Sequence, residues 1–411
     1  MKDNTQPTVV PKLRFPEFRD GPGWEEKPTE LLARVTQGGT PDTANTDYWN
    51  GCIDWLTPAE MGKHDSPYIA STRRTLTEKG LQSCSSELLP AYSVILSTRA
   101  PIGHLAINTA PMAINQGCRG LVPVENVDTH FVYNSLLHAK PRLTDLGAGN
   151  TFKELSGSAL KGFLLLTPSP AEQHKIADCL SSMDELIVAH GRKLEALRTH
   201  KKGLMRQMFP RKGESLPHFR FPEFRDAPEW EEKKLATVID LISGVHLAPN
   251  EYSTQGDVPY FTGPSDFTNK VDDIVKWTAE SLKTANAHDT LITVKGSGVG
   301  EIWYLTLPKV AIGRQLMAVR AHDSTGFIHH FLTTKRARFE SLASGNLIPG
   351  LSRSDILDMS TPFPPPREQQ RIADCLSSVD DIITSATEQL ASLKKHRKSL
   401  MQQLFPTAEG R

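Results

Sequence analysis

The 411-residue chain has few cysteines and no long apolar run, and these two absences limit its class. No stretch of about 18 apolar residues exists, so no membrane-spanning helix is expected. The polar start, MKDNTQPTVVPK, lacks the apolar core of a secretory signal. No Cys-x-x-Cys pair exists among the five cysteines, which argues against a zinc site or a disulfide framework: Cys52, Cys84, Cys118, Cys179 and Cys375. We therefore expect a folded protein of a reducing cytoplasm.

The chain also lacks an excess of charge and the common catalytic motifs. Its 47 basic residues balance 47 acidic ones, so any surface for a polyanion must be local. There is no His-Glu-x-x-His, Gly-x-Ser-x-Gly, Walker A or Asn-Pro-Pro-aromatic motif. The Gly-rich stretch Gly296–Gly300 is expected between two strands, whereas a phosphate-binding loop requires a strand followed by a helix. These absences predict a protein that binds neither a metal nor a cofactor and is not an enzyme.

What the chain does have is an internal duplication. RFPEFRD at Arg14–Asp20 returns unchanged at Arg220–Asp226, and Trp-Glu-Glu-Lys follows it both times. EQHKIADCLSS at Glu172–Ser182 returns as EQQRIADCLSS at Glu368–Ser378. The stretches between these blocks hardly agree. The pattern indicates a duplicated unit whose ends are retained and whose middle has diverged.

Each copy ends in a segment with apolar residues at alternating steps of three and four. This spacing predicts two helices of roughly 35 residues, each about 50 Å long, between Pro170 and Pro210 and between Pro366 and Pro406. Two matched seams favour an antiparallel coiled coil that also serves partner contacts. The alternative is an apolar face packed on a globular domain. The seam residues are Ile176, Leu180, Met183, Ile187, Leu194, Leu197, Ile372, Leu376, Val379, Ile383, Leu390 and Leu393.

The diverged middles contain the candidate binding residues. Tyr92–Asn108 and Thr290–Leu305 each predict a strand, a turn and a second strand, and the next strand in each copy leads to a polar elbow. Arg, Gln and Asn side chains at such sites can make paired hydrogen bonds with base edges, although single residues of this kind are more often solvated surface. The candidates are Arg73, Arg74, Thr98, Arg99, Asn115, Gln116, Arg119, Lys295, Ser297, Arg314, Gln315, Lys335 and Arg336.

These features together predict an α+β fold. Two globular mixed α/β domains should alternate with two long helices that pair antiparallel, in a pseudo-two-fold and cyclic layout. The expected parts are an N-terminal segment at 1–23, a first domain at 24–168, a first spacer helix at 169–212, a linker and second domain at 213–364, and a second spacer helix at 365–411.

The chain resembles the DNA specificity subunit of Type I restriction-modification enzymes. The resemblance rests on the order of heads and helices, on PSPAEQHKIADCLSSMDELI and PPPREQQRIADCLSSVDDII, and on the hairpin STRAPIG followed by NQG. In the second copy Arg314–Gln315 replaces the Asn-Gln pair. The resemblance implies that each head is a target recognition domain reading one half of an asymmetric double-stranded DNA target, with the helices setting the gap.

The resemblance also implies the partners. Two modification subunits, which bind S-adenosylmethionine and methylate adenine, would dock on the chain, and ATP-dependent restriction subunits would join them. The chain itself would carry no cofactor. Two other classes remain open, namely a two-headed adaptor that binds proteins and an enzyme with an unfamiliar site.

Overall fold

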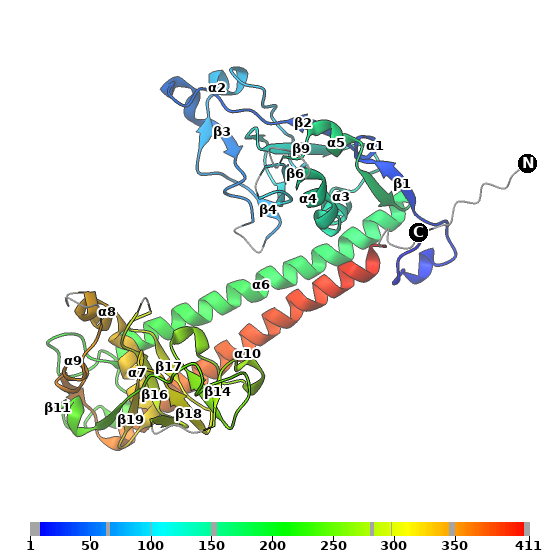
Figure 1. Ribbon diagram of the computed structural model, residues 1–411. Helices are drawn as coiled ribbons and strands as arrows, with labels where there is room; N and C mark the ends of the chain where they lie inside the picture. Colours follow the sequence, from blue (N-terminus) through cyan, green and yellow to red (C-terminus); the bar gives the residue numbers. More distant parts are fainter. Residues whose placement is uncertain are drawn as a thin grey trace, which may run out of the picture. The chain divides into compact units, whose positions relative to one another are not determined.

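The computed structural model describes residues 9–62, 66–99, 101–148, 154–279, 283–296, 298–344 and 350–406. They belong to two compact units, which are described separately. Unit 1 contains the chain up to Lys193 and from Ala386 onward, and unit 2 contains Leu194–Ser385 (Figure 1). Each unit therefore holds one globular head and a part of each long helix.

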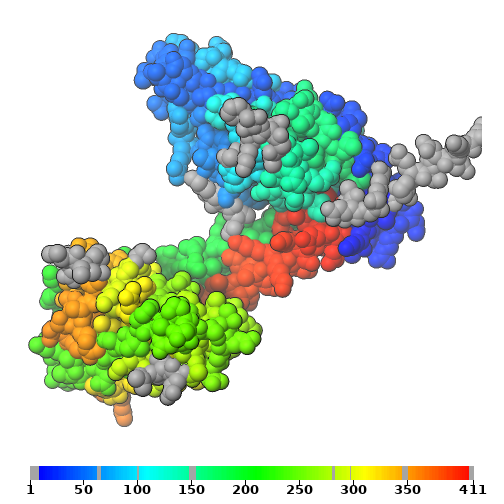
Figure 2. Space-filling model, in the orientation of Figure 1, coloured from blue at the N-terminus to red at the C-terminus, as the bar shows by residue number. Residues whose placement is uncertain are grey.

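Head 1 is built on two small sheets of largely buried strands. The first has the strand order β2-β9-β6-β7-β4 and the second β5-β3-β8. In Figure 2 the segment around α2 and β3, in blue, lies at one end of head 1, and the helices that follow β9, in green, lie at the other. The strands are β2 (Ala33–Gln37), β3 (Trp49–Leu56), β4 (Tyr68–Ile69), β5 (Thr75–Leu76), β6 (Val94–Ser97), β7 (Leu105–Asn108), β8 (Met112–Ile114) and β9 (Cys118–Pro123).

Head 2 repeats most of this arrangement although its sequence hardly matches that of head 1; among its described strands none corresponds to β4, and β15 is added beside β18. Its sheets have the orders β12-β19-β16-β17 and β14-β13-β18-β15. The Gly-rich stretch does lie in a hairpin, because β16 pairs antiparallel with β17. The strands are β12 (Ile239–Ser243), β13 (Val258–Phe261), β14 (Trp277–Thr278), β15 (Thr284–Asn286), β16 (Thr290–Thr293), β17 (Ile302–Tyr304), β18 (Lys309–Ile312) and β19 (Leu316–Ala321).

Short helices and a two-stranded sheet complete each head. Asp128 and Ser324 cap equivalent helices, since each side chain accepts from the backbone N–H three residues later. The elements in head 1 are β1 (Glu25–Pro28), β10 (Leu164–Thr167), α1 (Thr29–Leu32), α2 (Glu78–Gln82), α3 (Thr129–His138), α4 (Lys140–Ala148) and α5 (Gly157–Lys161). Those in head 2 are β11 (Glu231–Lys234), β20 (Ser360–Phe363), α7 (Thr325–Thr334), α8 (Arg336–Ser344) and α9 (Arg353–Leu357).

The two long helices, α6 (Pro170–Met208) and α10 (Pro366–Leu404), have 39 residues each. In unit 1, Arg397 of α10 donates to Asp184 of α6 over 2.6 Å and 2.8 Å. In unit 2, Lys201 of α6 donates to Asp380 of α10 over 2.5 Å and 2.6 Å. Asp380 is the repeat equivalent of Asp184, and Lys201 that of Arg397. The expected antiparallel pairing is therefore present in each unit, in the same register.

The seam residues contact both a head and the other helix. In unit 1, Ile176 and Leu180 share a buried cluster with Trp24 of head 1 and with Leu404 of α10. In unit 2, Ile372 and Leu376 lie in the core of head 2 with Met208 of α6. In its first turns, each long helix therefore packs both on a globular head and on the other long helix. Farther along, Ile187 and Leu194 are buried, whereas six seam residues are half-buried: Met183, Leu197, Val379, Ile383, Leu390 and Leu393.

The RFPEFRD segments lie beside the ends of the long helices. In unit 1 the backbone N–H of Leu13 donates to the Gln403 carbonyl of α10 over 3.0 Å. In unit 2 the equivalent bond joins Phe219 to Gln207 of α6 over 2.8 Å. The segment before Trp24 therefore lies against the end of α10, as the cyclic layout predicts.

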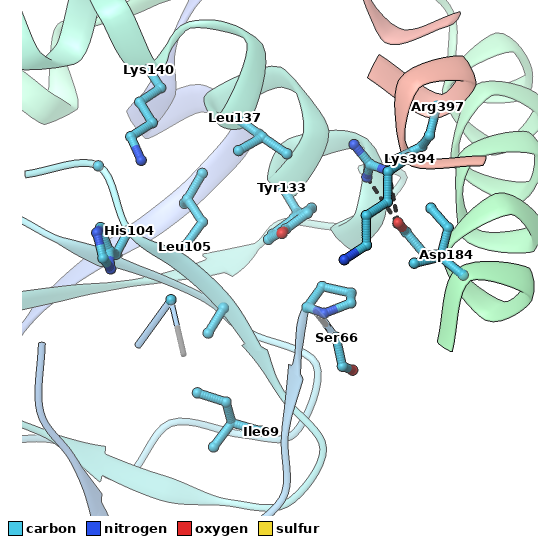
Figure 3. Close-up of a pocket in the computed structure, with 15 residues that line it drawn as sticks. Ser66, Ile69, His104, Leu105, Tyr133, Leu137, Lys140, Asp184, Lys394 and Arg397 are labelled. Atoms are coloured by element: carbon cyan, nitrogen blue, oxygen red, sulfur yellow. Dashed lines mark hydrogen bonds and ion pairs between the residues drawn. The ribbon is translucent and has the colours of Figure 1, made fainter. Parts of the chain in front are cut away.

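Head 1 meets the helices around a cavity of about 360 Å³. Figure 3 shows His104 and Leu105 from the hairpin side, Tyr133 from α3, and Asp184 facing Arg397. Nδ1 of His104 donates to the Met61 carbonyl over 3.1 Å. Burial raises the pKa of Tyr133 to about 12, so this phenol stays neutral. The cavity is a polar junction between a head and its helix pair.

Candidate nucleic-acid interface

Four loops meet at one edge of head 1, and we call them loop cluster 1. They follow β2 and β3, cap the β6–β7 hairpin, and join β8 to β9: Gly38–Thr40, Thr57–Pro58, Thr98–Arg99 and Asn115–Arg119. Three backbone hydrogen bonds hold these loops together: Gly39 N to Ile114 O (2.9 Å), Asn115 N to Leu56 O (2.9 Å) and Thr98 N to Gly117 O (2.8 Å). The hairpin and the elbow expected from the sequence therefore lie side by side.

Loop cluster 2 is the same assembly in head 2. Its loops are 244–246, 262–264, 295–296 and 313–315. The equivalent bonds are Val245 N to Ile312 O (2.9 Å), Gly313 N to Phe261 O (2.8 Å) and Val294 N to Gln315 O (2.7 Å). Two heads with diverged sequences thus present the same four loops on the same backbone frame.

A glycine directly after β2 in head 1, and directly after β12 in head 2, permits this close approach of the loops. A Cβ on Gly38 would lie 1.9 Å from the Asn115 carbonyl oxygen, and one on Gly244 would lie 2.2 Å from that of Gly313. Since backbone atoms block both positions, any other residue would force the loops apart. A glycine directly after an equivalent strand, present in both copies, was the available sequence signal.

The side chains of loop cluster 1 form a connected polar surface. Asn115 donates to Thr40 over 2.9 Å and accepts from the Gly117 N–H over 2.8 Å. The hydroxyl of Thr40 donates to Gln116, whose side chain is exposed. Asn115 therefore holds the elbow in its conformation. Gln116 faces solvent, and its side chain is hydrogen-bonded to Thr40.

Two arginines flank this surface. Arg99 is half exposed and pairs with Glu154 over 3.1 Å. Arg119 donates to the carbonyl oxygens of Gln116 and Cys118 over 3.2 Å and 3.0 Å. Both guanidinium groups retain donors beyond these bonds, because an arginine carries five N–H groups.

Thr98 does not fit the direct DNA contact predicted for it. It is fully buried, and its hydroxyl donates to the Gly117 carbonyl over 3.2 Å. The backbone N–H of Leu155 covers it further by donating to the Thr98 carbonyl over 2.9 Å. Thr98 therefore anchors the hairpin to the elbow through Gly117, and Arg99 is the exposed residue of this loop.

Loop cluster 2 offers different side chains on the same frame. Arg314 is exposed, and its guanidinium has no hydrogen bond or ion pair within the described ranges. Gln315 is half-buried, and its amide oxygen lies 2.7 Å from the place of a Cβ on Gly263. Lys295 is exposed and forms a β-bridge with Gly350. Ser297 lies outside the described residues.

The other predicted residues lie outside the two loop clusters. Arg74 places its guanidinium 3.6 Å from the centre of the Trp49 ring, so it serves packing, while Arg73 is exposed. Arg336 is paired with Glu301 and with Glu340, which uses much of its charge.

Sequence reasoning missed several residues of the loop clusters. Thr40 and the exposed His246 occupy equivalent loops, and neither belongs to a repeated block. Next to loop cluster 2, Asp266 accepts from Thr262 of the cluster over 2.6 Å and from Lys276 over 3.1 Å. Burial opposes the ionisation of Asp266, but these bonds outweigh it and lower its pKa. Because these residues lie in the diverged middles, no repetition marked them.

The described residues contain neither a candidate metal site nor a candidate membrane span. No group of three His, Cys, Asp or Glu side chains in these ranges could hold a metal ion. None of the described helices combines the length and the apolar character that crossing a membrane requires.

The duplicated chain thus presents two loop clusters on equivalent backbone frames. The family model for the Type I restriction modification DNA specificity domain matches residues 22–199 and 228–395. The chain therefore belongs to this family and contains its domain twice.

Relatives and solved structures agree with this assignment. The chain is 28% identical over 403 residues to the Type I restriction enzyme MjaIX specificity subunit of Methanocaldococcus jannaschii, across 93% of this chain and 92% of that protein. It resembles the crystal structure of the Type I restriction-modification S subunit from M. genitalium with a TM-score of 0.67 and 18% identity, over 97% and 100% of the two chains. A chain solved in work on complex assembly and conformational transition of the type I R-M system has a TM-score of 0.57 and 19% identity, over 94% and 98%.

Proposed function

We propose that this protein is the sequence-specific DNA-binding subunit of a Type I restriction-modification complex. Each head reads one half of an asymmetric, bipartite target, and the paired helices set the gap between the halves. The observation that carries the proposal is the pair of loop clusters. Equivalent backbone bonds support them, while Gln116 in one and Arg314 in the other give them different exposed chemistry.

The polar groups of the loop clusters suit base edges. An amide such as that of Gln116 can bond adenine through two atoms, and a guanidinium such as that of Arg314 can bond guanine in the same way. Because Asn115 and Thr40 fix the neighbourhood of Gln116, little conformational entropy would be lost on binding. The same scaffold could then read two different half-sites by exchanging only exposed side chains.

The long helices support the docking of two identical partners. Leu186 on α6 and Ile382 on α10 are repeat equivalents, and they are 47% and 50% exposed. One turn earlier, Ser182 and Ser378 are also exposed and equivalent. Large exposed apolar side chains at the same place in both copies fit a partner that binds twice. We call these two surfaces the docking faces and assign them to two modification subunits.

The partners would supply the chemistry. The modification subunits bind S-adenosylmethionine and methylate adenine, and the restriction subunits add the ATP-dependent nuclease. The chain described here would need no cofactor of its own, and the complex would act in the cytoplasm.

Reconstitution tests this function. The chain is mixed with the modification subunits of its own system, and adenine methylation of genomic DNA is mapped by sequencing. We expect one bipartite motif that appears only when the chain is present. Methyl transfer from labelled S-adenosylmethionine by the chain alone would contradict the non-catalytic role, and methylation without any shared motif would contradict sequence reading.

A further inference from the structure

Unit 2 contains a cavity of about 790 Å³ between the linker that precedes head 2 and the start of α8. Four cationic side chains line it, and we call it the basic pocket: Arg211, Lys212, Lys335 and Arg338. Arg211 and Lys212 come from the linker, Lys335 caps the end of α7, and Arg338 lies in the first turn of α8. Four separate stretches of unit 2 thus converge, because Trp230 and Glu232 at β11 and Ser360 and Thr361 of β20 also line the cavity.

Positive charge exceeds negative charge in the lining of the basic pocket. The side chains of Arg211, Lys212 and Arg338 have no ion pair within the part of the chain that the structure describes. Glu214 and Glu232 also line the pocket, and the carboxylate of Glu214 accepts from the backbone N–H of Arg211 and from His218, while it also interacts with the charge of Arg211. Four cations therefore face two carboxylates, one of which is already engaged.

The pKa of Lys335 reflects both its burial and the crowding of positive charge in the basic pocket. Burial lowers the pKa of its ammonium group, and the positive charge of Arg338 lowers it further. An anion in the pocket would relieve both effects. Hydroxyl groups of Ser215, Ser360 and Thr361 belong to the same lining. Cations combined with hydroxyl donors are typical of phosphate sites.

Head 1 lacks the same set of residues. Ala139 stands where head 2 has Lys335. Arg142, the equivalent of Arg338, places its guanidinium 4.8 Å from the centre of the Phe163 ring, and Met359 replaces that ring in head 2. The basic pocket is therefore a feature of head 2, and the duplication alone does not explain it.

The basic pocket adjoins the support of loop cluster 2. Arg336, next to Lys335, donates to Glu301 at the base of the β16–β17 hairpin over 2.9 Å. Lys295 lies at the tip of that hairpin. A phosphate held in the pocket would thus fix head 2 beside its reading loops.

We propose that the basic pocket binds a phosphate group of the DNA backbone and positions head 2 on the duplex without reading sequence. The proposal rests on the DNA-binding function given above. It adds an asymmetric anchor, so that the two heads contribute unequally to sequence-independent affinity.

The test measures DNA affinity of the reconstituted complex against salt concentration, on a target duplex and on a random duplex. The variant is Lys335→Gln with Arg338→Gln. The control removes the same charge from head 1, as Arg142→Gln with Lys161→Gln. We expect the variant to weaken binding about tenfold on both duplexes and to reduce the slope of log K against log salt by about one. The control should keep the wild-type slope.

A second variant, Arg211→Gln with Lys212→Gln, guards against a folding defect because both side chains are exposed on the linker. It should reproduce the effect with an unchanged melting temperature. Equal slopes for the wild type, both variants and the control would overturn the basic pocket while leaving the DNA-binding function intact. Normal DNA binding combined with weakened subunit assembly would also overturn it, because the pocket would then hold an acidic protein surface. No DNA binding by the wild-type complex would instead defeat the proposed function.

Discussion

The guanidinium of Arg14 donates two hydrogen bonds, of 2.8 Å and 2.7 Å, to the carboxylate of Glu172, which lies 158 positions later in the sequence. Both side chains are nearly inaccessible, at 8% and 1% exposure. The same bonds join Arg220 to Glu368 in unit 2. Each repeated RFPEFRD block is therefore bound to a repeated Glu-Gln block by a buried ion pair. This contact explains why the two blocks were retained together while the heads diverged.

Removing one partner of this pair should be costly. Glu172→Gln leaves the Arg14 guanidinium buried without its countercharge, and we expect a loss of about 3 kcal/mol in the free energy of unfolding. Glu368→Gln should behave alike in unit 2. The matched control is Glu17→Gln, because Glu17 pairs with Lys175 at the surface and should leave the free energy of unfolding close to the wild-type value. Urea unfolding measures all three, and equal effects for Glu172→Gln and Glu17→Gln would contradict the account.

The junction of head 2 with its helices should be sensitive to acid. Burial lowers the pKa of His329 to about 3 and that of His330 to about 2, with Lys201 adding to both. His330 also lies 4.0 Å from Asp380 and 3.4 Å from Ser377. Both rings are neutral in the folded state, whereas the unfolded chain protonates them near pH 6.5. Their contribution to stability is therefore complete above that pH and is lost as the pH falls below it.

The expected slope is up to about 2.7 kcal/mol per pH unit for two protons, between roughly pH 6 and pH 5. The repeat supplies a control, since Tyr133 and Asn134 occupy these positions in head 1. The variant His329→Tyr with His330→Asn should flatten the pH dependence in this window. An unchanged slope, measured by urea unfolding at each pH, would show that other groups cause it.

The long helices and their antiparallel pairing could be predicted because heptad spacing is a local and repeated signal. The elbow of Asn115 and Gln116 was also predictable, since a polar run between two apolar strands marks a turn. The burial of Thr98 was not predictable, because it depends on Leu155 and Gly117 arriving from other parts of the chain. Thr40 was not predictable for the same reason, because its contact with Asn115 joins two loops that are distant in sequence. The common strand order of the two heads depends on which apolar runs pair with each other. The diverged sequences of the two middles do not show this pairing.

The docking faces should each bind one partner. Leu186→Asp places a charge at the centre of one face, and Ile382→Asp does so on the other. Each single variant should lower the number of bound modification subunits from two to one, and the double variant should bind none. Val275→Asp is the control, because Val275 is 68% exposed in head 2 and lies away from the long helices in sequence. Native mass spectrometry gives the stoichiometry, and two subunits on the double variant would show that the faces are elsewhere.

Helix length should set the gap in the DNA target. Deleting one heptad from each helix, residues 189–195 and 385–391, keeps the ion pairs Asp184–Arg397 and Lys201–Asp380 in place. The deletion shortens the spacer by about 10 Å, which corresponds to about three base pairs. The mapped motif should keep both half-sites and change only the gap. An active complex with the original gap would mean that the helices are not the ruler.

The central claim is that each loop cluster reads its own half-site, and the most direct test compares Gln116→Ala with Arg314→Ala. Both side chains are exposed on equivalent frames, so neither substitution should disturb folding. The measurement is binding of the reconstituted complex to a DNA library randomised at every position of the mapped target. We predict that each substitution relaxes preference at one position, by about 1–3 kcal/mol, and that the two positions lie in different half-sites. Equal weakening of all sequences by both substitutions, or relaxation within a single half-site, would contradict the claim.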